Sequence, residues 1–382
     1  MNRIEIDERP IFNQRNESLD YNADILDNYF RLHLKDGVNC SISMRSADTV
    51  IEIFSEYLSS DFNAEHIYKA ILEVVHNGTF LQRLELIVVQ GVTLNSKSKI
   101  TIHTSSYCLS LKSILEQTCF FDSTRIRLNA DLSLNGHVTS PNLKLILNNN
   151  EKRRLHLLEH NAVDLTWCAS GNVHELRSAS SDILQNYTFV NKRGHNVFFL
   201  KSANEELRTW CVYLRREIQN AFLRKQTGQV DAIETWSSFM SKIESQNFKI
   251  EENKLLPNII KLGYADYYPN QELPETIKGV FQRYHIEVVL QKFDSLKTQI
   301  FHEDTCDMVL GILSPSFSDE ASIPLQLLTP RNFKEAGNLL NHNNITSITS
   351  DSIPIFCSRV IYWRNKRSKL DYDNYGKIIL TT

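Results

Sequence analysis

Four stretches of the sequence decide the fold: NIIKL at 258–262, LPETIKGVFQRY at 273–284, IEVVLQ at 286–291 and DMVLGIL at 307–313. The first, third and fourth are apolar runs of the length typical of buried strands. The second places its apolar residues at helical spacing, and a further helix is expected at 294–300. Strands that alternate with helices predict a largely parallel sheet, covered by helices, with a rim where ligands commonly bind.

A second unit of the same kind lies upstream. A strand is expected at 142–148, a helix from Glu151 to Asn161 and a short strand at 163–166. The longest expected helix, 204–226, carries an apolar stripe with arginines on the opposite face. The other expected elements are strands at 29–34, 84–89 and 98–103 and helices at 47–58, 64–76 and 108–118. These elements predict an α/β protein.

The length and composition of the chain favour a packed protein with two lobes. Its 382 residues exceed the size at which a single core usually stops growing. Hydrophobic residues make up 42% and charged residues 23% of the chain, which is typical of globular proteins and not of disordered ones. The start of the chain is polar and shows no hydrophobic pattern, so residues 1–25 are expected to form a poorly ordered lead-in.

The N-terminus and the cysteines indicate where the protein works. Residues 1–9 carry acids where a secretory signal would carry an apolar stretch. The seven cysteines are odd in number and form no Cys-x-x-Cys pair, which fits reduced thiols better than a disulfide framework. As written, the chain is expected to be cytoplasmic, and a start further upstream would make it extracytoplasmic. The longest apolar runs are strand-sized, so no membrane insertion is expected.

Charge and motifs argue against several classes of function. The net charge of -3 and the pI near 6.5 give no general attraction for nucleic acid or for anionic membranes. The sequence contains no serine-hydrolase elbow, no phosphate-binding or dinucleotide-binding loop and no His-Glu-x-x-His motif. We therefore expect a non-catalytic protein with no cofactor.

Two groups of residues could in principle bind a metal ion. His156 and His160 lie four apart on a predicted helix, and His302 to Asp307 offers hard and soft ligands in one short stretch. Charged neighbours favour a solvated helix face for the first group. A polar loop before a strand explains the second equally well, so no metal site is predicted.

Basic and aromatic residues suggest two further sites. The basic residues Arg359, Arg364, Lys366, Arg367 and Lys369 could contact nucleic acid, but a charged hairpin turn between two strands is favoured. Trp167, Trp210 and Trp236 could line a cleft, because aromatic walls suit small ligands. Trp210 is assigned to the core, since it lies on the apolar stripe of a helix. For Trp167, which follows a predicted strand edge, both interpretations stay open.

Four stretches resemble, in chain order, the sequence pattern of the solute-binding proteins of peptide- and nickel-type ABC importers, called family 5. They are 29–38 with 46–50, 143–164, 194–200 and 307–319. The resemblance implies a two-lobed, periplasmic-binding-protein-like fold of type II, with mixed, largely parallel sheets and a hinge. It also implies a non-catalytic protein that closes two lobes on a small solute or peptide and works with an ABC permease.

The resemblance also implies a division into lobes and a set of ligand-binding residues. Lobe 1 would comprise 26–197 and 350–382, with a reduced N-terminal part, and lobe 2 would comprise 198–349. The chain would cross between them near Asn196–Leu200 and Ser352–Phe356. The implied ligand-binding residues are Trp167, Asn196, Ser314, Ser316 and Asp319.

The implied site departs from the family pattern at one position. Peptide binders of the family carry a carboxylate that pairs with the amino terminus of the ligand, and the matching residue here is Ser316. Without that charge-assisted bond, binding of peptides in general is not expected.

Two alternatives remain. SgrR-like transcriptional regulators join a winged-helix DNA-binding domain to a signal-less solute-binding domain, and the basic turn at 363–368 resembles that group. The chain would then be a cytoplasmic ligand-sensing domain that has lost or lacks its DNA-binding domain, its partner. The other alternative is an interaction scaffold that keeps the fold but has lost its pocket, as the serine at 316 suggests.

Overall fold

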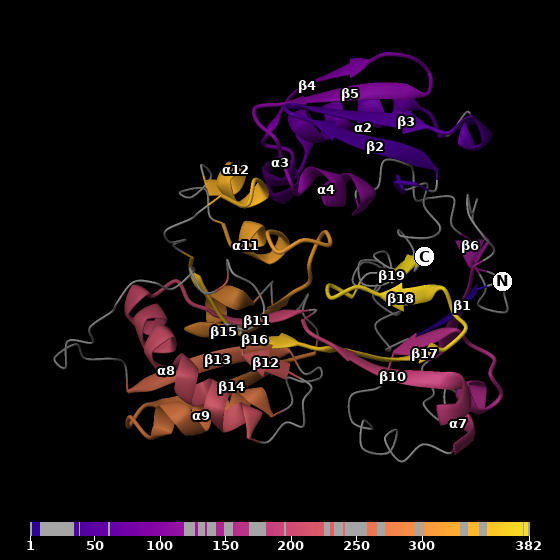
Figure 1. Ribbon diagram of the computed structural model, residues 1–382. Coiled ribbons are helices and arrows are strands. Elements are labelled where there is room, and N and C mark those ends of the chain that lie inside the picture. Colours follow the sequence, from indigo (N-terminus) through magenta and orange to yellow (C-terminus); the bar gives the residue numbers. More distant parts are fainter. Residues whose placement is uncertain are drawn as a thin grey trace.

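The computed structural model describes residues 2–7, 34–37, 39–59, 62–117, 127–128, 134–135, 143–148, 156–167, 181–194, 196–224, 230–232, 240, 258–265, 272–294, 299, 302–328, 335–343, 350–376 and 378–380. Three sheets organise these residues into two lobes and a third unit (Figure 1). Among them, no helix is long and apolar enough to cross a bilayer.

Lobe 1 is built on a five-stranded sheet with the order β10-β17-β9-β1-β8. Its strands are β1 (Asn2–Asp7), β8 (Leu143–Asn148), β9 (Leu165–Trp167), β10 (Tyr187–Lys192) and β17 (Val360–Asn365). β1 is parallel to β8 and β9, while β17 is antiparallel to β9 and β10. A buried cluster around Trp363 and Tyr187 packs the sheet against a helical turn at 156–159 and against α7 (Ser181–Asn186).

The position of β1 corrects the expected lead-in at 1–25. Asn2–Asp7 lie inside the sheet, where Ile4 pairs with Leu145 on one side and Leu165 on the other. Isoleucines alternate with polar residues here, which is a strand pattern. The stretch is too short to identify without the flanking strands that hydrogen-bond it. The rest of the lead-in, and all but Leu34 of the strand expected at 29–34, lie outside the described residues.

Lobe 2 is built on a six-stranded sheet with the order β12-β16-β11-β15-β13-β14. Its strands are β11 (Val197–Lys201), β12 (Val230–Ala232), β13 (Ile259–Ala265), β14 (Glu287–Phe293), β15 (Met308–Leu313) and β16 (Ser352–Ser358). The helices α8 (Glu205–Leu223) and α9 (Leu273–Gln282) cover one face. The strands and helices expected at 204–226, 258–291 and 307–313 are therefore confirmed. The helix expected at 294–300 lies outside the described residues apart from Asp294 and Gln299.

The sheets are mixed, as expected, but they are not largely parallel. In lobe 2, β13 is parallel to β14 and β15, whereas the pairs formed by β11, β12 and β16 are antiparallel. The physical reason is that β11 carries the chain into lobe 2 and β16 carries it out again. Neighbouring strands that enter and leave a lobe at the same side must run in opposite directions.

The longest helix forms where the sequence predicted it, because its start is capped. The side chain of Asn204 accepts hydrogen bonds from the amides of Glu206 and Leu207, which have no partner inside the helix. Glu205 and Glu206 in the first turn interact favourably with the helix dipole. The residues Leu207, Cys211, Leu214, Ile218 and Phe222 form its buried stripe.

The third unit is an antiparallel sheet with three helices, inserted between β1 and β8. The sheet has the order β2-β3-β5-β4. Its elements are β2 (Cys40–Arg45), β3 (Asp48–Ile53), η2 (Ser55–Tyr57), α2 (Ala64–Asn77), α3 (Phe80–Glu85), β4 (Val89–Leu94), β5 (Lys99–Thr104) and α4 (Leu111–Gln117). The predicted helices at 64–76 and 108–118 and the strand at 98–103 are confirmed.

Two predictions in this unit are wrong. The helix expected at 47–58 is the strand β3 followed by η2, because Thr49, Ile51 and Ile53 alternate into the core and β-branched residues favour strands. The strand expected at 84–89 is the end of α3 and a turn. Thr79 and Gln82 form a capping box that starts this helix, a signal that outweighs the short apolar run.

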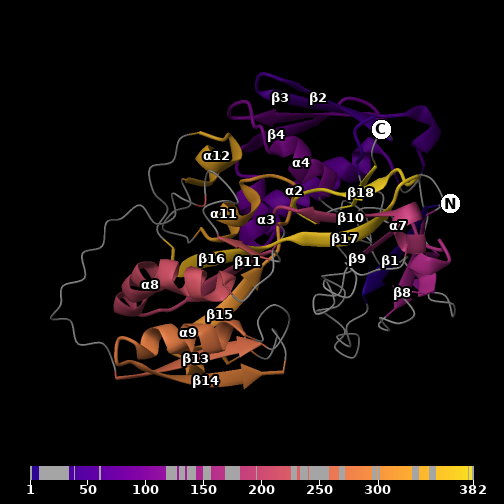
Figure 2. The same ribbon diagram turned by 60° about the horizontal axis from the view of Figure 1, so that its bottom comes forward.

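The remaining described elements are short. They are β6 (Arg127–Leu128), β7 (Leu134–Asn135), η7 (Glu303–Thr305), α11 (Ser322–Gln326), α12 (Glu335–Leu340), β18 (Leu370–Tyr372) and β19 (Ile378–Leu380). In Figures 1 and 2, α11 and α12 lie between the third unit and the sheet of lobe 2. β18 and β19 form a hairpin in lobe 1, next to β17.

Gly311 of β15 is a position where the sheet of lobe 2 tolerates no side chain. An added Cβ atom would lie 2.3 Å from the ring of Phe199 on the paired strand. We expect Gly311→Ala to lower the free energy of unfolding by about 1–3 kcal/mol through overpacking, measured by urea denaturation. Gly279→Ala, on α9 with open space around it, is the matched control and should leave stability unchanged or raise it. Equal losses for both variants would contradict the prediction.

Candidate ligand-binding site at the facing sheet edges

One two-stranded ribbon joins the lobes. β10 pairs with β17 in lobe 1 up to Lys192 and Val360, and β11 pairs with β16 in lobe 2 from Val197 and Cys357 onward. The chain therefore crosses at 193–196 in one direction and at Arg359 in the other. The sequence predicted crossings near 196–200 and 352–356, a few residues inside the strands of lobe 2.

The strand directions bring the carboxyl ends of both sheets to this crossing. In lobe 1, β1, β8, β9 and β10 all end at the edge that faces lobe 2. In lobe 2, β13, β14 and β15 end at the edge that faces lobe 1, since Leu313 pairs with Val197. Ligands of open α/β sheets bind outside the carboxyl ends of strands. The two facing edges are therefore the candidate site.

Asn196 and Ser314 meet at this edge. Asn196 lies in the crossing segment, where its amide donates to the Ser358 hydroxyl and its carbonyl accepts from the Ser358 amide. Ser314 directly follows β15, and its hydroxyl donates to the Asn196 side-chain oxygen at 3.0 Å. Two of the five predicted residues thus form one hydrogen-bonded pair that ties the crossing to the loop after β15.

Ser316 and Asp319 lie in the same loop, but both have structural partners. The Ser316 amide donates to the Ser322 hydroxyl at 2.7 Å, and the two hydroxyl oxygens lie 3.1 Å apart. A carboxylate oxygen of Asp319 accepts from the Ala321 amide at 2.8 Å and lies 2.9 Å from Nε2 of His342. These contacts shape the turn into α11. Trp167, the fifth predicted residue, ends β9 and pairs in register with Tyr362.

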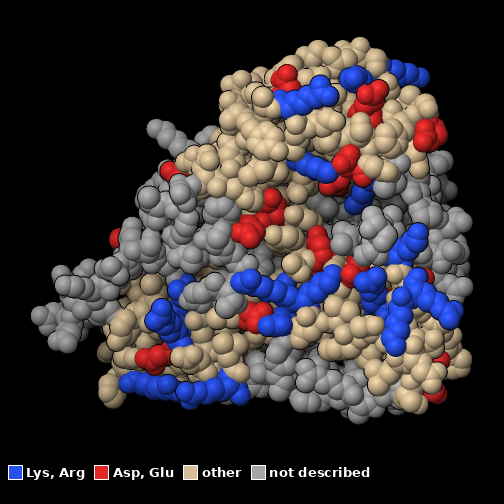
Figure 3. Space-filling view, in the orientation of Figure 1, with Lys and Arg blue, Asp and Glu red and all other residues tan. Residues whose placement is uncertain are grey.

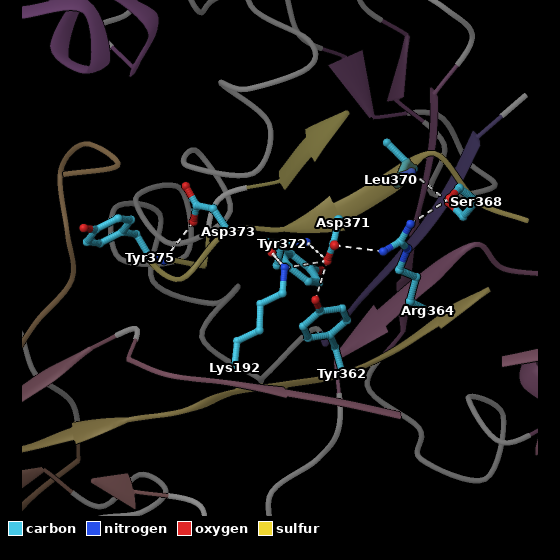
Figure 4. Close-up of polar contacts among 9 residues, drawn as sticks. All are labelled: Lys192, Tyr362, Arg364, Ser368, Leu370, Asp371, Tyr372, Asp373 and Tyr375. Carbon is cyan, nitrogen blue, oxygen red and sulfur yellow. Dashed lines mark hydrogen bonds and ion pairs between the residues drawn. The ribbon is translucent and has the colours of Figure 1, made fainter. Parts of the chain in front are cut away.

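A buried polar cluster at the edge of lobe 1 was not predicted from the sequence. Asp371 of β18 accepts hydrogen bonds from Lys192 at 3.0 Å, from Arg364 at 2.9 Å and from the Tyr362 hydroxyl (Figure 4). Lys192 also donates to the carbonyl of Tyr372. The Asp371 side chain is 10% exposed, so two cations surround one almost buried carboxylate.

The environment of Asp371 sets its charge. Burial by itself would raise the pKa of this carboxyl, but hydrogen bonds from Tyr362 and Lys192 outweigh burial and hold the pKa below its ordinary value. Burial and the Asp371 carboxylate together raise the pKa of Tyr362 above its ordinary value. Asp371 is therefore ionised and Tyr362 protonated at neutral pH. The cluster anchors β18 onto β10 and β17 with fixed charges.

A second ion pair lies at the crossing. Nη2 of Arg359 lies 2.6 Å from a carboxylate oxygen of Asp231, on β12. Figure 3 shows Lys and Arg side chains gathered over lobe 1 and along the crossing, with Asp and Glu side chains between them and the third unit. The surface along the crossing is thus charged.

The sequence held a signal for the Asp371 cluster. Tyr362 and Arg364 lie two apart, and side chains two apart share one face of a strand. A turn of basic residues and then Asp371 follow, so the hairpin returns an acid to that face. Of the basic residues at 359–369, Lys366, Arg367 and Lys369 lie in the hairpin turn between β17 and β18, where Lys366 donates to the carbonyls of Leu184 and Gln185. Arg359 lies at the crossing, and Arg364 lies in β17.

The remaining candidates from the sequence are the possible metal ligands and two tryptophans. His156 and His160 stack on one another on an exposed turn, and Glu303 pairs with Lys201 at 2.6 Å. Within the described parts of the chain, no three His, Cys, Asp or Glu residues are placed to hold a metal ion. Trp210 is half-buried and packs edge-on against Tyr284 at the surface of lobe 2. Trp236 lies outside the described residues.

Two buried thiols are Cys357 of β16, near the crossing, and Cys108, just before α4 of the third unit. Burial raises the pKa of Cys357 to about 12 and that of Cys108 to about 11. Both thiols are therefore protonated at neutral pH, and the thiolate is the reactive form.

The Asp371 cluster makes a prediction about stability. Asp371→Asn removes the charge that both Lys192 and Arg364 contact, and we expect it to lower the free energy of unfolding by about 3 kcal/mol, measured by urea denaturation at pH 7. Because the folded-state pKa of Asp371 is depressed, its contribution is complete above the ordinary aspartate pKa of about 3.9 and fades as the pH falls through the folded-state value.

The variant should therefore lose stability at neutral pH but approach the wild type in strong acid. Asp182→Asn, at an exposed position on α7, is the matched control. A constant difference between Asp371→Asn and the wild type from pH 7 down to pH 2 would contradict an ionised Asp371.

Neither a protein-family model nor a curated protein sequence matches the chain. Solved structures match it over nearly its whole length at low identity. One is a dipeptide-binding protein from Pseudoalteromonas in complex with Met-Leu, with 12% identity, a TM-score of 0.65 and coverage of 99% of this chain and 98% of that one.

Another similar structure is NikA from Staphylococcus aureus in complex with Ni(L-His)2, with 14% identity, a TM-score of 0.62 and coverage of 98% and 97%. A third is AgaA from A. tumefaciens R10 in complex with agropinic acid, with 9% identity, a TM-score of 0.62 and coverage of 100% and 99%. The chain therefore has the two-lobed fold of periplasmic solute-binding proteins.

Proposed function

We propose that this protein binds a small solute or peptide without catalysis, by closing its two lobes on it. The observation that carries the proposal is the geometry of the crossing. Two sheets with separate apolar clusters face each other through their carboxyl ends and are joined by one two-stranded ribbon. Such a ribbon allows the lobes to rotate about the crossing while each core stays intact.

The chemistry of the similar structures supports a polar ligand. These structures hold a dipeptide, a nickel–histidine complex and agropinic acid. All three are small and carry charged or metal-coordinating groups. The facing edge of lobe 1 carries Lys192, which is paired with Asp371, and the loop after β15 of lobe 2 carries Asp319. We infer a small charged solute, with an ABC permease as the partner that receives it.

The loop after β15 argues against peptides in general. Ser316 stands where the family's peptide binders carry an acid, and its hydroxyl lies against Ser322. The neighbouring acid, Asp319, is paired with His342. A ligand ammonium group therefore meets no unpaired carboxylate at either position. A sensing role beside a DNA-binding regulatory domain would use the same closure and stays a prediction from the sequence.

Ligand-induced stabilisation tests the proposal. A ligand stabilises the closed state only by its differential affinity for it. At 100 times its dissociation constant it should raise the free energy of unfolding by about 2.7 kcal/mol. Thermal-shift measurements with dipeptides, histidine with Ni²⁺, sugar phosphates and opines should therefore give at least one shift that grows with concentration.

Two variants test whether the ligand that causes this thermal shift binds at the facing sheet edges. Trp167→Arg, at the carboxyl end of β9, should abolish that shift, because it adds bulk and charge at the candidate site. Tyr213→Arg, an exposed position on the outer face of α8, should leave it unchanged. No shift with any probe in a folded sample, or equal losses in both variants, would count against the proposed function.

A further inference from the structure

The third unit belongs to lobe 1 in sequence but not in packing. It is inserted between β1 and β8, which are paired strands of the lobe 1 sheet. Its apolar core, however, continues into the helices that follow β15 of lobe 2. In Figures 1 and 2, α3 lies next to α11, on the side of lobe 2.

One buried cluster contains residues from both parts. The third unit contributes α2, α3 and α4 as well as its sheet, and lobe 2 contributes α11, α12 and the crossing ends of β11 and β16. Members from the third unit include Ile67, Ile71, Leu84, Leu111 and Leu115, and members from lobe 2 include Val197, Phe317, Ile323, Leu325, Leu339, Leu340 and Cys357. All of them are 5% exposed or less, so separating the two parts would expose a core.

Hydrogen bonds cross the same boundary at the start of α4. The Ser110 amide donates to the Leu340 carbonyl at 3.1 Å, and the Ser110 hydroxyl lies 3.2 Å from Nε2 of His342. The Asn341 side chain donates to the Ser106 hydroxyl at 2.7 Å. The third unit and lobe 2 are therefore joined by hydrogen bonds as well as by apolar contacts.

Among the described residues of lobe 1, the tip of one hairpin contacts this shared cluster. Tyr375 lies in the turn between β18 and β19, and its ring packs against the cluster shared by the third unit and lobe 2. The turn is fixed by Asp373, which accepts from the Tyr375 amide, and by Gly376, which has a φ of 77°. In Figure 4, Tyr375 points away from the Asp371 cluster that holds the base of the hairpin.

The surroundings of Tyr375 belong to the other body. Burial raises the pKa of its hydroxyl, and the nearby Asp319 and Glu320 of the loop after β15 raise it further. Among the described helices and strands, those of the lobe 1 sheet make no contact with the third unit comparable to that of α3 with α11 and α12.

We propose that the third unit and lobe 2 move as one body against lobe 1, and that Tyr375 is the contact made on closing. This inference rests on the proposed function, because it assumes that the lobes open and close. From the chain order alone, the third unit would be expected to move with lobe 1, because it is inserted between two strands of that lobe. The Asp371 cluster would then hold the hairpin rigid, so that the tip carries the docking residue as part of lobe 1.

Pulsed electron spin resonance on the full chain tests the assignment without a ligand. The label positions are one on each of the three units: the exposed Lys69 on α2 of the third unit, Glu275 on α9 of lobe 2 and Gln185 on α7 of lobe 1. The protein is labelled at two of these positions at a time. Attachment through a genetically encoded azide residue avoids the seven cysteines. The 69–275 distance should be single and narrow. The 185–275 and 185–69 distances should be broad or split, and should change together.

Substitution of Tyr375 tests the contact. Tyr375→Ala should raise the open population seen in both 185 distances by roughly fivefold, since a packed aromatic ring supplies a stabilisation of that order. It should leave the 69–275 distance unchanged. Tyr375→Phe keeps the ring and should stay close to the wild type. Tyr213→Ala removes an exposed tyrosine of lobe 2 and is the matched control.

The outcomes separate this inference from the proposed function. A broad 69–275 distance with a narrow 185–69 distance would overturn the inference, and the proposed function would stand, because the lobes would still move. Three narrow distances that no variant changes would overturn both. An unchanged open population in Tyr375→Ala would overturn the role of Tyr375.

Discussion

The antiparallel ribbon that runs through both sheets is the constraint on which the structure depends. β10 and β17 form its part in lobe 1, and β11 and β16 form its part in lobe 2. Because both strands of the ribbon leave one sheet and enter the next, neither lobe can slide past the other. The ribbon also fixes the direction of every neighbouring strand. The carboxyl ends of the parallel strands in each sheet therefore face the crossing, where a solute can contact both lobes.

Buried and half-buried ion pairs hold further parts of the chain against the ribbon. Asp371 lies between Lys192 and Arg364, so the C-terminal hairpin is held against the ribbon at the edge of lobe 1. The ion pair of Arg359 and Asp231 lies at the crossing itself. Each of these charges has an opposite charge within hydrogen-bond distance, so the hairpin and the crossing are held in a set geometry.

The packing of the apolar residues does not follow the chain order. A chain segment inserted in lobe 1 completes the core of helices that belong to lobe 2, because apolar faces bury each other wherever the backbone brings them together. The described residues of the lobe 1 sheet keep a separate cluster around Trp363. A boundary drawn at the crossings follows the chain order and places the third unit with lobe 1, whereas the division that we propose follows the packing.

Local pattern determined the α/β class, the helices α2, α4, α8 and α9, and the strands β5, β8, β13, β14 and β15. The helices have apolar residues at helical spacing and the strands are short apolar or alternating runs, and both signals act within a few residues. The resemblance to the solute-binding family predicted the two lobes and named Asn196 and Ser314 as ligand-binding residues. In the structure, the Ser314 hydroxyl donates to the Asn196 side-chain oxygen at 3.0 Å.

The tertiary structure decided how β1 is paired and how Asp371 is surrounded, and it carries the proposal about the third unit. Asn2–Asp7 become a strand because β8 and β9 hydrogen-bond both of its sides. Asp371 is ionised in a nearly buried place because Lys192, from a strand far away in the chain, meets it there. These features depend on pairs of residues distant in sequence. A local pattern specifies the face that a residue shows, whereas the partner on that face is known only after the chain has folded.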